Sequence, residues 1–186
     1  MNSPFMNYFQ TELTNRGFLT VRFNFDYMDQ KRRVPDPQPK LQARYRAVIE
    51  EVIEQHKPKR LVIGGKSMGG RVASYIAGDI PEVRGLVFLG YPLHPPGKQD
   101  QLRDAHLYEL PRPMLFISGT KDTFAGRPLL KNVVKKIGDR ATLVWIEGGD
   151  HSLKTSKTDK QSLQAAADAI EGWVRDLQIE DNACFW

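Results

Sequence analysis

The feature that most constrains this chain is the pentapeptide Gly-Lys-Ser-Met-Gly at residues 65–69. It lies between an apolar run at residues 61–64 and a helix-like segment at residues 71–77. Strand, sharp turn and helix in this order are typical of a G-x-S-x-G turn, in which glycines leave room for a tight backbone and the serine hydroxyl is pushed out of the sheet. Ser67 is therefore a candidate nucleophile, and the N–H of Met68, at the start of the helix, is a candidate oxyanion donor.

The pentapeptide also suggests two other structures. Residues 65–67 resemble the end of a phosphate-binding P-loop, but that motif needs a glycine five positions before its second glycine, and Arg60 stands there. A structural glycine-rich turn between a strand and a helix is the simpler alternative. The pentapeptide alone does not separate this alternative from a nucleophile.

Two further strand-like runs end in polar residues that can handle a proton. The run at residues 114–118 is followed by Asp122, and the run at residues 142–146 is followed by His151. Because the carboxyl ends of parallel strands share one edge of a sheet, we expect both side chains to converge on Ser67. The order serine, acid, histidine is that of α/β hydrolases. In such a triad His151 accepts the serine proton, and Asp122 orients the imidazole.

Taken singly, each partner has a plainer interpretation. Asp122 is also typical of a turn or a helix cap, and His151 of a loop histidine bound to a backbone carbonyl. Three placements that agree in order and in strand-end location favour the triad. Asp150, adjacent to His151, is expected to have a structural or capping role. His56 and His106 lie in or beside helical patterns and are expected to be ordinary surface residues.

Residues near other strand ends are candidates for substrate contact. His94 lies in a loop at residues 91–98, where flanking prolines give a stiffness that suits a pocket wall. Tyr27 and Met28 follow the strand expected at residues 21–25, although simple surface packing explains them equally well. The full set of expected substrate contacts is Lys66, Tyr91, His94, Tyr27 and Met28.

Residues 64–71, 91–98 and 148–152 together resemble a small α/β-hydrolase branch related to dienelactone hydrolases. That branch also contains subunit 3 of the non-specific-lethal chromatin complex and testis-expressed hydrolase-like proteins. The similarity spans almost the whole chain. It implies a serine hydrolase fold whose site is completed by an Asp and a His, and some members of the branch serve as scaffolds.

The sequence departs from this branch at its beginning. Relatives carry a strand and a His-Gly-containing loop before the segment that residues 1–4 resemble, whereas this sequence starts at Met1. The loop normally supplies a second oxyanion donor, and loss of one donor lowers turnover by about two to three powers of ten. The strand would lie beside the one that carries Ser67. We therefore expect a fragment, or a fold in which neighbouring strands or another chain compensate for unpaired backbone groups.

The whole pattern predicts a single α/β-hydrolase-like domain over residues 1–186, with a mostly parallel sheet of about five strands, helices on both faces and a minimal lid. Three alternating prolines between residues 35 and 39 favour an extended connection and exclude a helix over residues 26–39. Helical patterns cover residues 4–15, 41–55, 68–77, 128–137 and 161–177.

Composition narrows the location and the partners. The sequence has no apolar run long enough for a transmembrane helix and no signal peptide, which predicts a cytoplasmic protein. The single cysteine, Cys184, cannot form an internal disulfide. There are 27 basic and 22 acidic residues. Because acidic side chains are interspersed and aromatic residues do not interleave with the bases, we expect a solvated surface rather than a nucleic-acid site.

These features leave two function classes. The first is an acyl hydrolase that acts on a small ester, thioester or amide without a cofactor or a metal ion. The second is a catalytically weak or inactive α/β-hydrolase-fold protein that acts as a binding or scaffold module.

Overall fold

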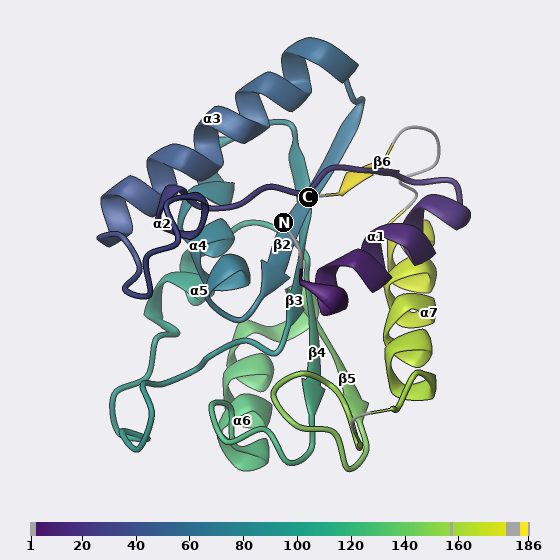
Figure 1. Ribbon diagram of the computed structural model, residues 1–186. Coiled ribbons are helices and arrows are strands. Elements are labelled where there is room, and N and C mark those ends of the chain that lie inside the picture. The colour runs from purple at the N-terminus through teal and green to yellow at the C-terminus, as the bar shows by residue number, and fades with distance from the viewer. Residues whose placement is uncertain (1–2, 157, 178–182, 186) are drawn as a thin grey trace.

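The computed structural model describes residues 3–156 and 158–177, and the backbone of residues 183–185. Its described strands form one six-stranded sheet in the order β1-β6-β2-β3-β4-β5, and all paired neighbours are parallel (Figure 1). Parallel neighbours need crossover connections, which the helices between the strands supply. The strands are β1 (Leu19–Thr20), β2 (Arg60–Lys66), β3 (Val83–Leu89), β4 (Met114–Gly119), β5 (Ala141–Ile146) and β6 (Ala183–Phe185).

Helices cover both faces of this sheet, and the buried apolar residues fall into two clusters, one under each layer (Figure 1). On one face lie α1 (Pro4–Asn15) and α7 (Gln161–Asp176). On the other lie α3 (Gln38–His56), α4 (Met68–Ile76), α5 (Ala105–Glu109) and α6 (Arg127–Ile137). The expected layered architecture is therefore confirmed. Within the described residues, no helix has the length and apolarity needed to cross a membrane.

Helix α1 shows how local sequence produces one of these layers. The Ser3 side chain caps the helix and accepts a hydrogen bond from the backbone N–H of Met6 at 3.4 Å. Phe5, Phe9 and Leu13 recur every four residues, so they share one side of the helix, and all three are buried against the sheet. The capped start places the beginning of α1 beside the cavity described below.

The segment after β1 differs from the expectation in three ways. The ladder ends at Thr20, and residues 21–25 are not a strand. A short helix α2 forms at Asp26–Asp29, and α3 already begins at Gln38 with a proline in its first turn. The prediction of a connection without helix was wrong at both ends. At the α3 end, proline is tolerated in the first turn of a helix, where its missing N–H has no intrahelical acceptor to lose. At the other end, α2 finishes at Asp29, before the first of the three prolines.

Strand β6 was not predicted from the sequence. It lies between β1 and β2, beside the strand that leads to Ser67, where we expected unpaired backbone groups. The sequence suggests neighbouring strands or a second chain at this place, but the chain's own residues 183–185 occupy it. The register pairs Arg60 with Ala183, Leu61 and Leu19 with Cys184, and Thr20 with Phe185.

Beyond the stretch that pairs with β6, a side chain satisfies part of β2. The Tyr45 hydroxyl accepts a hydrogen bond from Gly64 N–H at 3.1 Å and donates one to the Gly64 carbonyl at 2.7 Å. Burial of this phenol raises its pKa, so it stays protonated and can do both. The backbone N–H and carbonyl of Gly64, which lies opposite Val87 of β3, are thus both bonded to one side chain, and Tyr45 also forms part of the cavity wall.

Candidate active site

The turn between β2 and α4 holds Ser67 in an unusual backbone conformation, with φ of 52° and ψ of −120°. Non-glycine residues rarely adopt positive φ, and such strain is concentrated at functional sites. The close approach of α4 to β2 depends on Gly70, because a Cβ atom there would lie 2.7 Å from the Gly65 carbonyl oxygen. Met68 is the first residue of α4, where backbone N–H groups have no intrahelical acceptor.

Three side chains from three loops form a continuous hydrogen-bonded chain. His151, after β5, places Nε2 2.9 Å from the Ser67 Oγ and Nδ1 2.8 Å from an Asp122 carboxylate oxygen. The other Asp122 oxygen accepts the Phe124 N–H at 2.8 Å. The Asp122 side chain is fully buried, whereas 21% of the His151 side chain is exposed. With a proton on Nδ1 donated to Asp122, the Nε2 lone pair is free to accept the Ser67 hydroxyl.

Two glycines allow the three loops to meet. Gly90, at the end of β3, has φ of 68°, and a Cβ atom there would lie 2.7 Å from the His151 carbonyl oxygen. At Gly119, the last residue of β4, a Cβ atom would lie 2.1 Å from the Gly149 carbonyl oxygen. Larger residues at either position would push the histidine loop away from the strand ends.

The loop that carries His151 is held by its own local contacts. Asp150 accepts hydrogen bonds from the backbone N–H groups of Ser152 and Lys154, at 2.7 and 3.1 Å. The Phe124 ring packs against the imidazole, with 4.5 Å between ring centroids. Asp150 therefore shapes the turn, as expected, and contributes no hydrogen bond to His151 among the described contacts.

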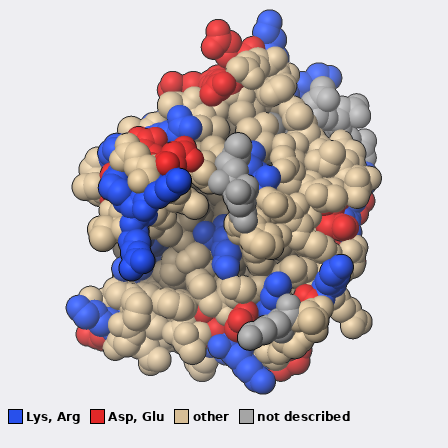
Figure 2. Space-filling view, in the orientation of Figure 1, with Lys and Arg blue, Asp and Glu red and all other residues tan. Residues whose placement is uncertain are grey.

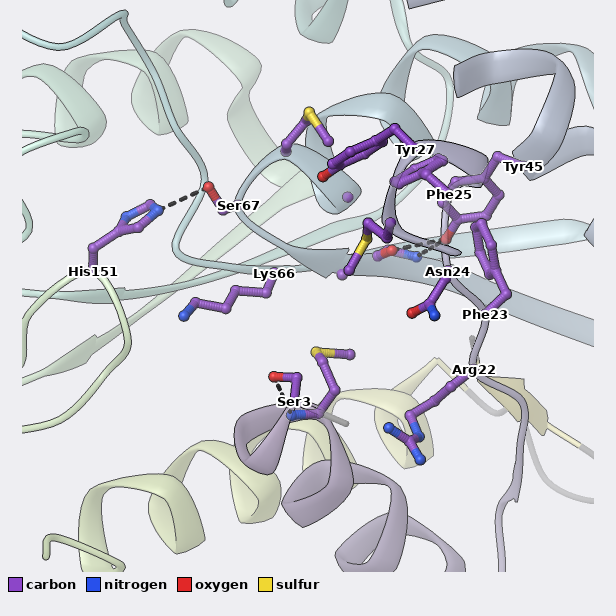
Figure 3. Close-up of a pocket in the computed structure, with 16 residues that line it drawn as sticks. Ser3, Arg22, Phe23, Asn24, Phe25, Tyr27, Tyr45, Lys66, Ser67 and His151 are labelled. Carbon is purple, nitrogen blue, oxygen red and sulfur yellow. Dashed lines mark hydrogen bonds between the residues drawn. The ribbon is translucent and has the colours of Figure 1, made fainter. Parts of the chain in front are cut away.

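A cavity of about 450 Å³ opens beside Ser67 (Figure 3) and forms the hollow in the surface in Figure 2. Tyr27, Met28 and Lys66 line it, as the sequence predicted, together with the aromatic residues of the segment after β1 and the start of α1, which the sequence did not single out. The complete lining is Ser3, Met6, Arg22, Phe23, Asn24, Phe25, Tyr27, Met28, Tyr45, Gly64, Gly65, Lys66, Ser67, Met68, Gly69 and His151.

The other two expected substrate contacts are placed differently. Tyr91 and His94 are each only 1% exposed, and neither belongs to the lining of this cavity. The Tyr91 hydroxyl donates to the Arg103 carbonyl, and His94 Nδ1 lies 2.8 Å from the Pro95 carbonyl. Leu93, between these two residues, is also fully buried, so this part of the loop at residues 91–98 points into the protein. These two residues therefore stabilise the loop, and the structure does not support the substrate contact expected for them.

Comparison with known proteins gives the family. The sequence profile described as "Alpha/beta hydrolase domain" matches residues 1–175. The chain belongs to the α/β-hydrolase family. A putative α/β hydrolase from Agrobacterium tumefaciens superposes with a TM-score of 0.77 at 19% identity, over 97% of this chain and 80% of that one. An α/β serine hydrolase without a lid from Xanthomonas campestris gives 0.74 at 22% identity, over 95% and 74%.

An esterase domain from Rhodothermus marinus gives a TM-score of 0.71 at 18% identity, over 92% of this chain and 79% of that one. At these identities the likeness concerns the fold. The α/β-hydrolase fold predicted from the sequence is thus confirmed, with six described strands in place of about five.

This α/β hydrolase contains a second serine–histidine pair. Ser74 Oγ lies 2.8 Å from His106 Nε2, and the imidazole stacks on Tyr75 with 4.0 Å between ring centroids. Burial, together with the smaller effect of the positive charge of Arg71, lowers the pKa of His106 to about 4. The expectation of an ordinary surface histidine was wrong, because the packing of α5 on α4 buries part of the ring, and no local sequence signal reports that contact.

Proposed function

We propose that this protein is a serine acyl hydrolase of the esterase type. The single observation that carries the proposal is the hydrogen-bonded chain from Asp122 through His151 to Ser67, which ends at a strained serine that faces the cavity. Ser67 is the nucleophile, His151 the general base and acid, and Asp122 the residue that orients the imidazole. The N–H of Met68 is the oxyanion donor.

These roles follow the ordinary course of acyl transfer. His151 Nε2 takes the proton of Ser67 as Oγ attacks the substrate carbonyl carbon, and Asp122 stabilises the imidazolium that forms. The Met68 N–H stabilises the negative oxygen of the tetrahedral intermediate. Collapse breaks the bond to the alcohol, thiol or amine, which leaves with the proton from His151. Water, activated by the same imidazole, then releases the acid and restores Ser67.

A fluorophosphonate probe tests this proposal, because it labels activated serines rapidly. We expect wild-type protein to be labelled and Ser67→Ala to remain unlabelled. Ser74→Ala is the matched control, since among the described residues Ser74 is the other serine within hydrogen-bond distance of a histidine, and this variant should be labelled at the wild-type rate. The proposal of a serine hydrolase would be refuted if Ser67→Ala were labelled as strongly as wild-type protein. It would also be refuted if wild-type protein with a folded circular dichroism spectrum were not labelled.

The second candidate is a binding module that keeps the fold and the site without turnover. What favours it is the sequence likeness to a branch with scaffold members. A cytoplasmic location, a small acyl ligand as the partner and no role for nucleic acid remain predictions under either candidate. Under the binding candidate, wild-type protein would bind an ester in the cavity without hydrolysing it, as Ser67→Ala would.

A further inference from the structure

The charged side chains that line the cavity are of one sign. Among its described lining residues are Lys66 and Arg22, and none of them is Asp or Glu. Figure 3 shows Lys66 on the side of the cavity nearer to Ser67 and His151, and Arg22 at the other end. Most of the remaining wall is apolar or aromatic. A negatively charged group that enters therefore meets attraction from the wall and no repulsion from a lining carboxylate.

Lys66 is the cation closest in sequence to the nucleophile, and its described partners are uncharged. Its Nζ donates a hydrogen bond to Ser152 Oγ at 2.7 Å and lies 4.6 Å from the centroid of the Phe5 ring. Within the part of the chain that the structure describes, Lys66 forms no ion pair. The hydroxyl and the ring face stabilise the ammonium, but neither neutralises it.

The surroundings of Lys66 are also partly dehydrated. Burial lowers the pKa of its ammonium, the attraction of Asp150 and Asp122 offsets this effect only in part, and the positive charge of Lys154 adds to it. Asp122 is itself hydrogen-bonded to His151 and to a backbone N–H. A partly buried cation without a counter-ion gains more from a carboxylate than an exposed lysine does, since charge-assisted hydrogen bonds strengthen as water is excluded.

We propose that Lys66 determines specificity by selecting substrates that carry a carboxylate, such as half-esters of aliphatic dicarboxylic acids. The carboxylate contacts the Lys66 ammonium while the scissile carbonyl lies at Ser67 Oγ, and the apolar wall takes the carbon chain. This inference rests on the proposed function and names its substrate class. A carboxylate on the acyl part or on the leaving alcohol can make the same contact, and the two sources are separated below.

The test compares 4-nitrophenyl half-esters of succinic to suberic acid with neutral esters in which a methyl ketone replaces the carboxylate. The measured quantity is the ratio of kcat/KM for the half-ester to that for the ketone, after subtraction of spontaneous hydrolysis. Wild-type protein should prefer one or more half-esters. Lys66→Met should lower that ratio about 10- to 100-fold, because it removes one charge-assisted contact. Lys66→Arg should keep most of it.

Lys131→Met is the matched control, because Lys131 is an exposed residue of α6 outside the cavity lining, and it should leave the ratio unchanged. A second arm uses 4-acetoxybenzoate, which carries the carboxylate on the leaving alcohol, against methyl 4-acetoxybenzoate. A Lys66-dependent preference in either arm supports the proposal and says on which side the carboxylate binds.

Wild-type protein that hydrolyses the neutral esters without preferring a carboxylate in either arm would overturn the proposal and leave the hydrolase standing. This outcome does not depend on whether a Lys66 variant folds. A Lys66→Met effect equal on charged and neutral esters would also overturn it and would assign Lys66 to holding Ser152. If no ester is hydrolysed, isothermal calorimetry of Ser67→Ala with the half-amide of adipic acid tests carboxylate binding separately from turnover. A heat of binding that is lost when Lys66→Met is added to this variant supports the contact between Lys66 and the carboxylate. Absence of a heat of binding refutes that contact.

Discussion

The two serine–histidine pairs of this protein have nearly the same hydrogen-bond length but different surroundings. Ser67 lies 2.9 Å from His151, and Ser74 lies 2.8 Å from His106. The first serine has positive φ and lines a cavity, whereas the second lies within α4 and is only 2% exposed. A short serine–histidine contact therefore does not by itself identify a nucleophile. Access and backbone geometry differ at the two sites.

Electrostatics separates the two pairs further. A catalytic base becomes positively charged as it takes the serine proton, and the buried carboxylate of Asp122 stabilises that charge on His151. Burial and Arg71 oppose the charged form of His106, and the attraction of Asp104 is the smallest of the three influences on it. Neutral His106 is suited to holding α5 against α4 and unsuited to proton transfer.

The largest expected difference concerns the two aspartates. Asp122→Asn should lower kcat/KM by about four powers of ten, because the amide favours the wrong histidine tautomer while the packing stays intact. Asp104→Asn, beside the other histidine, should change kcat/KM by less than about threefold, in the range of surface substitutions. Steady-state kinetics on a neutral 4-nitrophenyl ester, with circular dichroism as the folding control, measures both. Similar losses in the two variants would show that the pairs are not functionally distinct.

The second prediction uses acid to separate the histidines. Only neutral His151 can accept the Ser67 proton, so kcat/KM should fall about tenfold per pH unit once this imidazole is protonated. His106→Phe should show the same profile, because His106 takes no part in proton transfer. The measurement is kcat/KM across the acid side of neutrality, with return to neutral pH to confirm reversibility. A flat profile, or one altered by His106→Phe, would contradict the assignment.

Local patterns were enough to predict which three side chains form the hydrogen-bonded chain of the proposed triad. Ser67 was marked by glycine spacing, and Asp122 and His151 by their places after apolar runs, so parallel strand order alone brought them to one edge. The helix that starts at Pro4 and the layered sheet were predicted from the periodicity of apolar residues, which is also a local pattern.

What could not be predicted depends on packing between distant elements. Strand β6 is three residues long, and its pairing with β1 and β2 has no local signature. The inward turn of Tyr91 and His94, and the packing of His106 against α4, are decided by neighbours far apart in sequence. The aromatic lining that residues 21–25 contribute to the cavity could not be predicted for the same reason, because this segment was expected to be a strand.

The third prediction concerns helix α4, which begins directly after Ser67 and contains Ser74. Gly70→Ala should lower the free energy of unfolding by about 1–3 kcal/mol, because its Cβ atom would meet the Gly65 carbonyl at 2.7 Å and force α4 away from β2. Gly69→Ala is the matched control: no atom lies within 4 Å of its Cβ position, so its stability should be equal or slightly higher. Urea unfolding measures both. Equal stability of the two variants would mean that the turn at Ser67 does not depend on this close contact.

The smallest expected effect is a pH-dependent stability that belongs to His106. Its pKa is lowered from 6.5 to about 4 in the folded protein, so between these values the unfolded chain binds the proton and the folded one does not. The contribution of neutral His106 to the free energy of unfolding is therefore complete above the pKa of the unfolded chain. It is lost as the pH falls toward the pKa of the folded protein. The shift corresponds to about 3 kcal/mol, which partial exposure of the ring reduces to about 1 kcal/mol.

His106→Phe keeps an aromatic ring on Tyr75 and removes the titration, and Ser74 still donates to the Arg71 carbonyl at 2.7 Å. Loss of the histidine contact should cost about 1 kcal/mol at neutral pH. Toward pH ~4.5 the wild type should lose more stability than the variant, so the two free energies of unfolding converge. Urea unfolding at several pH values measures this. Parallel curves would show that the His106 imidazole is protonated as readily in the folded chain as in the unfolded one, and the contrast with His151 would then rest on access and Asp122 alone.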